Sequence, residues 1–169
     1  MRLASKFFAV AVTLICCVGC DQVTKSIARK SLGSEPLSYL GNLFRLQYVE
    51  NPGAFLSLGA GAQEQTRFLV FTVFTGVFLA ALVGYVLVSR RATRAEVIAV
   101  SLLAGGGVGN LIDRVMNHGR VVDFLNLGIG PVRTGVFNVA DVAITVGALW
   151  MMGIYLKKEK SADLAGRSK

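Results

Sequence analysis

Charged residues are scarce in this sequence. Asp, Glu, Lys and Arg make up 17% of the 169 residues, whereas 53% of the residues are hydrophobic. About a quarter of the residues in an average soluble domain are charged, so this composition is unusual for a soluble protein of this length. We therefore infer an integral membrane protein from composition alone.

Several kinds of catalytic site lack the residues that they require. The single histidine, His118, would have to serve any serine or cysteine triad, but it lies in a polar loop and the chain has no Gly-x-Ser-x-Gly turn. A metalloprotease motif such as His-Glu-x-x-His is also absent. Cysteine occurs only at Cys16, Cys17 and Cys20, inside one hydrophobic run, without the second pair that a zinc site needs. We expect a chain without a metal site, a cofactor or thiol chemistry.

The first hydrophobic run has two interpretations. Arg2 and Lys6 precede an apolar segment that ends near Cys20, as in the cleavable signal of a lipoprotein. However, at least three further hydrophobic segments follow, whereas a lipoprotein is usually soluble after its anchor. We therefore predict an uncleaved first span over about 6–23.

Three further segments are long and apolar enough to cross a bilayer, which requires about 20 residues. These predicted spans lie at about 68–88, 97–112 and 136–156. The chain is thus expected to form a single domain, 1–169, with two outer loops, 24–67 and 113–135. The cluster of glycines from Gly105 to Gly109 favours close helix packing rather than a nucleotide-binding loop.

The first outer loop contains a strand pattern. Residues 44–49 alternate between apolar and polar side chains, as a half-buried strand does. Asn51-Pro52-Gly53 is a turn signal, and 54–58 could return as a second strand. We predict a small hairpin or cradle on the membrane surface with its apolar side toward the lipid. An ordinary connecting loop is the alternative.

Basic residues predict the orientation of the spans. Lys and Arg concentrate at both termini and after the second span, and such residues favour the cytoplasmic side. The net charge of +8 is therefore explained by topology and anionic headgroups, and no nucleic-acid partner is expected. This orientation gathers most of the polar residues at the span ends on the outer side. They are Asp21, Asn51, Asn110, Asp113, Arg114, Asp123, Asn138 and Asp141.

Two aspartates in apolar surroundings are the main candidates for chemistry. Asp123 stands among hydrophobic residues of the second outer loop, and Asp141 lies about five residues inside the fourth predicted span, where an acid is costly. Two carboxylates in a low dielectric share a proton, so one can activate a water while the other protonates a peptide carbonyl. The pair predicts an aspartic protease.

A proton relay in a small transporter or channel is the alternative, although few polar residues could continue a path. A purely structural subunit would leave the gathering of acids and amides unexplained.

Other polar residues are expected around the pair. Asn110, Asp113 and Arg114 share one helix face. In one interpretation, Asn110 and Arg114 hold a substrate backbone or a headgroup phosphate. In the other, these polar residues tie the third span to its neighbours. Asn138, three residues before Asp141, can hydrogen-bond a carboxylate or substrate. The residues expected to have structural polar roles are Asp21, Lys25 and Asp113.

Five sequence motifs occur in order between residues 21 and 141. They are Asp21-Gln22-x-x-Lys25, Asn51-Pro52-Gly53-Ala54-Phe55, Gly109-Asn110-x-x-Asp113-Arg114, Val121-Val122-Asp123-Phe124 and Phe137-Asn138-x-Ala140-Asp141. Together they closely resemble the bacterial lipoprotein signal peptidase family, signal peptidase II. The second motif departs from the family pattern Asn-x-Gly-Ala-Ala-Phe, because a single alanine separates Gly53 from Phe55.

The resemblance implies an all-α integral membrane protein of four transmembrane helices, with a small β-cradle on the periplasmic membrane surface. It implies a multi-pass protein of the bacterial inner membrane with both termini in the cytoplasm and the active site at the periplasmic face. The implied activity is aspartic endopeptidase cleavage of diacylglyceryl-modified prolipoproteins just before the lipidated cysteine, with Asp123 and Asp141 as the catalytic pair.

The implied partners are prolipoproteins, membrane lipids and inhibitors such as globomycin, and a monomer is expected. The position of Asp21 is associated with stability of the fold. The positions that match contacts to substrate or inhibitor are Asn51, Gly53, Asn110, Arg114, Val122, Asn138 and Ala140.

Overall fold

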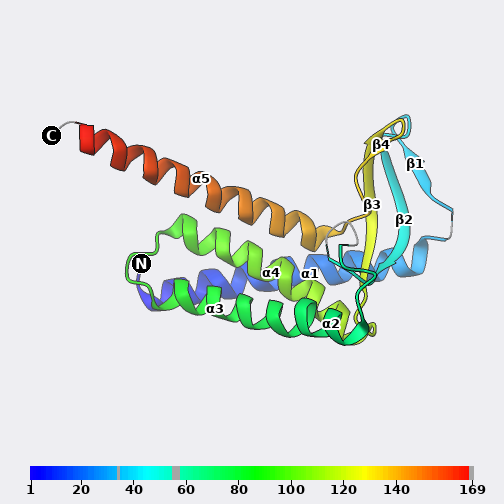
Figure 1. The fold of residues 1–169 in the computed structure, drawn as a ribbon, viewed down its shortest axis with the longest axis horizontal. Coiled ribbons are helices and arrows are strands. Elements are labelled where there is room, and N and C mark those ends of the chain that lie inside the picture. The colour runs from blue at the N-terminus through cyan, green and yellow to red at the C-terminus, as the bar shows by residue number, and fades with distance from the viewer. Residues whose placement is uncertain (34, 55–57, 168–169) are drawn as a thin grey trace.

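The computed structural model describes residues 1–33, 35–54 and 58–167, which form four long helical segments and a small antiparallel sheet (Figure 1). In this part of the chain, four helical segments are long and apolar enough to cross a membrane, which confirms the predicted architecture. The helices are α1 (Leu3–Ser31), α2 (Glu64–Phe68), the π-helical segment η2 (Leu69–Phe74), α3 (Thr75–Val88), α4 (Arg94–Met116) and α5 (Val139–Arg167). The second span is formed by α2, η2 and α3 together.

The central helix is α4, which packs against α1, α3 and α5. More than half of its apolar core segment is buried, whereas the other three spans are mostly exposed, as helices that face lipid would be. Its glycines permit this packing. A β-carbon at Gly106 would collide with the carbonyl oxygen of Ala140, and one at Gly109 would lie 2.6 Å from the Asp21 carboxylate.

The helix α1 continues to Ser31, well beyond the predicted end of the first span near residue 23. The sequence beyond Cys20 is polar, but Asp21 and Lys25 are buried and form an ion pair of 2.8 Å on one helix face. Because these side chains pack against α4 rather than facing water, they prolong the helix instead of ending it.

The opposite end of α1 is tied to α3 by a buried lysine. The Nζ atom of Lys6 donates hydrogen bonds to the carbonyl oxygens of Val86, at 2.8 Å, and Ser89, at 2.5 Å. These carbonyls belong to the C-terminal end of α3, where backbone acceptors lack helical partners and a cation is favourable. Lys6 therefore acts as a cap supplied by a neighbouring helix.

The sheet has the strand order β1–β2–β3–β4, and all of its neighbours are antiparallel. The strands are β1 (Leu37–Tyr39), β2 (Phe44–Asn51), β3 (Val121–Ile129) and β4 (Val132–Arg133). The strand expected at 44–49 is present, but its partners are β1 and β3. The segment expected to be a loop, 113–135, thus contains the end of α4 and two strands. The returning strand expected at 54–58 falls mainly on 55–57, outside the described residues.

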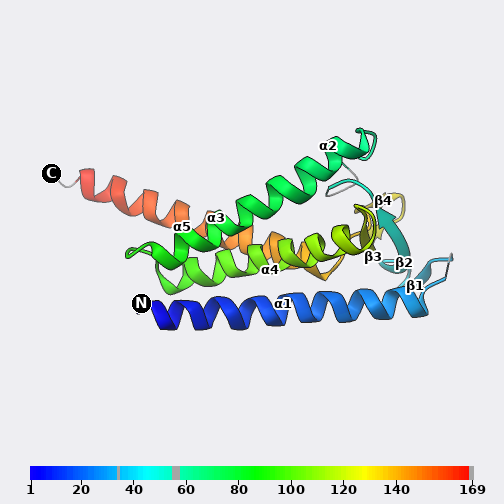
Figure 2. The ribbon, with the colours of Figure 1, turned by 90° about the horizontal axis from the view of Figure 1, so that it is seen from below.

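The sheet lies across one end of the helices, and both termini lie toward the other end (Figure 1). Seen from below, α2 and α3 diverge from α4 toward the sheet (Figure 2). The helix α5 begins at Val139, so Asp141 lies in its first turn rather than about five residues inside the span. The sheet, the divergent helix and the start of α5 thus meet at one end of the molecule.

Candidate active site

The start of α5 holds Asp141 by a reciprocal pair of hydrogen bonds. The side-chain oxygen of Asn138 accepts from the backbone N–H of Asp141 at 3.0 Å, and Asp141 Oδ2 accepts from the backbone N–H of Asn138 at 3.1 Å. This is the geometry of a helix capping box, with Asn138 as the cap. This cap explains why α5 starts at Val139 rather than at residue 136, where the predicted span begins. It also fixes the Asp141 carboxylate beside the helix N-terminus.

Asp123 comes from β3 and is almost completely buried. Its Oδ2 atom accepts a hydrogen bond from Asn51 Nδ2 at 3.0 Å, and its Oδ1 atom accepts one from Asn138 Nδ2 at 2.7 Å. The pairing of β2 with β3 sets Asn51 opposite Val121, two residues before Asp123. Asn138 therefore contacts both aspartates, one through its amide nitrogen and the other through the helix cap.

Burial raises the pKa of Asp123 to about 6, well above its ordinary value of 3.8. The hydrogen bond from Asn51 opposes this shift, the negative charge of Asp141 adds to it, and the hydrogen bond from Asn138 again opposes it. A neighbouring carboxylate makes the second negative charge costly, because two like charges in a poorly solvated site repel each other. The two acids therefore interact electrostatically across the site.

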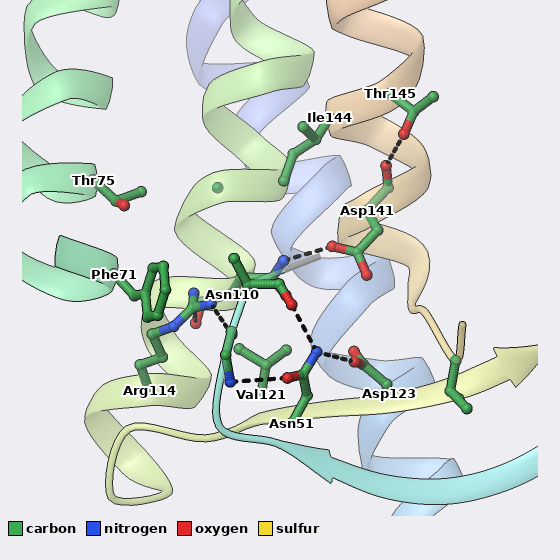
Figure 3. Close-up of a pocket in the computed structure, with 14 residues that line it drawn as sticks. Asn51, Phe71, Thr75, Asn110, Arg114, Val121, Asp123, Asp141, Ile144 and Thr145 are labelled. Atoms are coloured by element: carbon green, nitrogen blue, oxygen red, sulfur yellow. Dashed lines mark hydrogen bonds between the residues drawn. The ribbon is translucent and has the colours of Figure 1, made fainter. Parts of the chain in front are cut away.

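Both carboxylates line one cavity of about 300 Å³ at the open end of the helices (Figure 3). Six of the sequence-predicted site residues line this cavity: Asn51, Gly53, Asn110, Arg114, Asp123 and Asp141. The other three predicted contact residues, Val122, Asn138 and Ala140, have almost no exposed surface and lie behind the cavity lining. The structure thus separates residues that a ligand can touch from residues that hold them.

Several lining residues did not emerge from the sequence. Ile144 and Thr145 line the cavity three and four residues after Asp141, a helical spacing that could have identified them. Phe71 comes from η2 and lies beside the Arg114 guanidinium (Figure 3). The Cζ atom of Arg114 is 5.7 Å from the centre of the Phe71 ring. Phe71 carried no sequence signal, because a π-helical segment turns side chains out of ordinary helical register. Thr75, Gly107 and Val136 also line the cavity.

A family model described as signal peptidase (SPase) II matches residues 13–157, which include all five motifs. The chain belongs to the signal peptidase II family. A protein of Sphingopyxis alaskensis named lipoprotein signal peptidase is 39% identical over 155 residues, covering 90% of this chain and 84% of the relative. One of the same name from Syntrophus aciditrophicus is 35% identical over 141 residues, covering 83% and 87%.

Solved structures share this fold. A structure described as a bacterial membrane enzyme, determined by the in meso method at 2.3 Å resolution, superposes with a TM-score of 0.76 at 27% identity. The match covers 94% of this chain and 91% of that one. A second structure with the same description, at 1.9 Å resolution, gives a TM-score of 0.69 at 26% identity, covering 91% and 94%. This member of the signal peptidase II family is therefore a multi-pass membrane peptidase.

The three residues predicted to have structural polar roles form a buried ion cluster behind the cavity. The Nζ atom of Lys25 lies 2.8 Å from Asp21 and 3.0 Å from Asp113. Gln22 belongs to the same cluster and was not singled out from the sequence, although it stands in the first motif. Its amide donates to Asp113 at 3.1 Å and to the carbonyl of Gly109 at 3.1 Å.

The residues of the rejected site classes lie elsewhere. His118 is exposed and lines a separate polar cavity of about 500 Å³ with Glu50 and Glu64. Cys16 and Cys20 are exposed on α1. Among residues 1–33, 35–54 and 58–167, no three His, Cys, Asp or Glu side chains are grouped so that they could hold a metal ion.

A second cavity, of about 240 Å³, adjoins the first between the sheet and α5. It shares Asp141 and Thr145 with the first cavity. Its other lining residues are largely apolar and are Leu127, Thr134, Gly135, Phe137, Val142 and Val146. An apolar chamber thus opens directly beside one of the two aspartates.

Proposed function

We propose that this chain is an aspartic endopeptidase that removes the signal peptide from diacylglyceryl-modified prolipoproteins, cutting just before the lipidated cysteine. The observation that carries the proposal is that Asp123 and Asp141 line one cavity, come from different elements and share Asn138 as a partner. Two carboxylates that interact in a poorly solvated site can hold one proton between them. That is the state which acid–base hydrolysis of a peptide bond requires.

The raised pKa of Asp123 supports one division of the two roles. In the proposed cycle, Asp123 carries the proton and Asp141 is the base. Asp141 removes a proton from a water molecule as the water attacks the scissile carbonyl carbon, while Asp123 gives its proton to the carbonyl oxygen. The resulting gem-diol then collapses. Its hydroxyl proton returns to Asp123, the proton on Asp141 passes to the leaving amine, and the C–N bond breaks.

Neighbouring groups are proposed to orient this chemistry. Asn51, Asn110 and Asn138 donate side-chain N–H groups to the two carboxylates, at 3.0, 2.9 and 2.7 Å respectively. Arg114 donates to the carbonyl of Gly53 at 3.0 Å and has no carboxylate within 4 Å in the part of the chain that the structure describes. It also donates to the carbonyl of Asn110 at 3.5 Å, and its Nε atom is buried. The guanidinium lines the cavity and is proposed to bind a substrate carbonyl there. The side chains of Val122 and Ala140 are buried, so we propose that these residues support the site through their backbone N–H groups.

The apolar chamber beside Asp141 supports a lipid-modified substrate. A cysteine next to the scissile bond would bring its alkyl chains beside the aspartates, where largely apolar residues surround about 240 Å³. Relatives of this chain carry the name lipoprotein signal peptidase. We assign the chain to the bacterial inner membrane as a monomer, with both termini in the cytoplasm and the cavity at the periplasmic face. Peptide antibiotics such as globomycin would compete for the same cavity.

The first test is cleavage of a diacylglyceryl-modified prolipoprotein in detergent. Asparagine keeps the shape of aspartate but cannot take part in proton transfer, so Asp123→Asn and Asp141→Asn are each expected to lower kcat by about 100-fold or more. His118→Ala is the matched control and is expected to cut normally, because His118 lies in a different cavity. Thermal unfolding of each variant checks that it is folded.

A wild-type chain that does not cut, or either Asn variant that does, would overturn the assignment of the pair. The competing transporter function would then be tested by proton flux in liposomes. Cleavage is also expected to persist in the presence of a chelator, because the proposed cycle uses two carboxyl groups and water alone. Its loss would point to a different chemistry.

A further inference from the structure

A single buried ammonium group connects the helices α1 and α4 behind the cavity. Lys25 Nζ, on α1, lies 2.8 Å from Asp21 Oδ2, 3.0 Å from Asp113 Oδ2 and 2.9 Å from Asn110 Oδ1. All four residues are buried. A lysine ammonium has three protons and no acceptor, so these three contacts use its full capacity.

The contact with Asn110 determines how that side-chain amide is turned. Lys25 only donates, so it requires the oxygen of Asn110, and Asn138 Nδ2 donates to the same oxygen at 3.1 Å. The amide nitrogen of Asn110 is thereby directed at Asp141 Oδ1, 2.9 Å away. The reverse orientation would set N–H groups against an ammonium and an oxygen against a carboxylate, and both contacts would be repulsive. Lys25 and Asn138 together therefore set the orientation toward the proposed base.

The two acids of the cluster reach the peptide units beside the proposed catalytic pair. Asp21 Oδ1 accepts from the backbone N–H of Ala140, the residue before Asp141, at 2.9 Å. Asp113 Oδ2 accepts from the backbone N–H of Val122, the residue before Asp123, at 2.8 Å. Each acid that pairs with Lys25 thus also holds the backbone next to one of the two carboxylates.

We propose that Lys25 is a positioning residue for the proposed peptidase reaction. It sets the Asn110 amide so that its N–H faces Asp141, and it neutralises the acids that anchor Ala140 and Val122. This inference rests on the proposed function. It assigns Lys25 more than the structural role that its spacing from Asp21 indicates, because a merely structural cluster would stabilise the fold without acting through Asn110.

The test must avoid leaving buried acids unpaired. Lys25→Met alone strands two carboxylates and is expected to destabilise the protein strongly. The combined variant Asp21→Asn, Lys25→Met, Asp113→Asn removes all three charges together. Its asparagine oxygens can still accept from Ala140 and Val122, so the variant chiefly removes the hydrogen bond that orients Asn110. Lys30→Met, at an exposed position of the same helix, is the matched control.

The combined variant is made in the wild type and in Asn110→Ala, and kcat, KM and thermal stability are measured with a lipidated prolipoprotein. In the wild-type background we expect kcat to fall about 10- to 100-fold with KM nearly unchanged, because Lys25 does not touch substrate. In the Asn110→Ala background the further decrease is expected to shrink to about 3-fold or less, since residues that act through one another are not additive. Lys30→Met is expected to behave as wild type.

Two results would overturn the inference while leaving the proposed function intact. One is a folded combined variant with wild-type kcat. The other is a decrease in kcat that is equally large with and without Asn110, since this would show a general effect of the scaffold. An inactive wild type would instead overturn the proposed function together with this inference.

Discussion

Among the residues that the structure describes, asparagines rather than lysines or arginines contact the two carboxylates of the cavity. Asn51 and Asn138 donate to Asp123, and Asn110 and Asn138 hold Asp141. A lysine or arginine in direct contact would favour the charged form of a carboxyl group and remove the proton that an acid–base pair needs. The buried cation nearest to this network, Lys25, contacts the oxygen of Asn110 instead. Amide donors therefore orient the carboxylates without fully compensating their charge.

The raised pKa of Asp123 predicts the pH dependence of cleavage. A raised carboxyl pKa keeps the proton to higher pH, so the protonated acid is present below about pH 6 and is lost above it. With a pKa of about 6, about a tenth remains protonated at pH 7 and about a hundredth at pH 8. We expect kcat/KM, which reports the free enzyme, to fall roughly tenfold per pH unit above this value.

The variant Asn51→Ala tests whether titration of Asp123 causes this decrease in kcat/KM at alkaline pH. The hydrogen bond from Asn51 lowers the pKa of Asp123, so its removal is expected to move the alkaline limb of the profile to higher pH. A kcat/KM that stays constant between about pH 5 and about pH 9 in the wild type would contradict the assignment of Asp123 as the acid.

At the level of elements, Gly106 of α4 allows the first turns of α5 to pack closely beside the cavity. Gly106 lies against the carbonyl oxygen of Ala140 and against Ile144, at the first turns of α5. Asp141 follows Ala140 directly, so any displacement of this contact also displaces the proposed base. Close packing of α4 and α5 and the geometry of the site are therefore coupled.

Gly106→Ala is expected to lower both stability and activity. The added carbon would collide with the backbone oxygen of Ala140 and would lie 2.8 Å from Ile144, so the two helices would have to separate. Overpacking of this kind costs about 1–3 kcal/mol. We expect a lower thermal midpoint in detergent and at least about tenfold slower cleavage.

Gly153→Ala, on α5, is the matched control, because its added carbon meets nothing within 4 Å. A glycine-to-alanine change inside a helix is otherwise favourable by about 0.5–1 kcal/mol, so stability is expected to stay the same or rise slightly. Equal effects of the two substitutions would show that close packing at Gly106 is not what matters.

At the scale of the whole molecule, the two ends differ in composition. The sheet lies at one end, while both termini lie toward the other (Figure 1). The cavity is lined by residues of the sheet and of the helix ends beside it. Lysine and arginine concentrate in the terminal segments and in the turn between α3 and α4. Positive charge tends to stay in the cytoplasm, so this distribution supports the proposed topology, in which the cavity faces the outer side of the membrane.

Labelling can test this orientation. In a background with Cys16, Cys17 and Cys20 replaced by alanine, a membrane-impermeant maleimide is expected to label His118→Cys in intact spheroplasts. Arg91→Cys, at an exposed position between α3 and α4, is expected to react only after the membrane is permeabilised. The opposite pattern would reverse the proposed topology.

The four spans could be predicted from the sequence, because the length and hydrophobicity that a bilayer requires are local properties of the chain. The sequence also identified Asp123, Asp141 and the polar residues of the five motifs, because acids and amides stand out in apolar surroundings. It did not reveal that β2 pairs with β3, a contact between residues as far apart as Asn51 and Val121, since no local pattern encodes a partner.

Which of these residues line the cavity and which support it from behind depends on the tertiary packing. Asn138 and Ala140 lie behind the cavity rather than in it, because the capping of α5 and its contact with Asp21 turn them inward. Phe71 reaches the cavity from a π-helical segment, and Lys25 reaches Asn110 from another helix. These placements depend on how α1, η2, α4 and α5 pack together. Contacts between distant segments arise from the packing of whole elements, whereas a local sequence pattern describes only one element at a time.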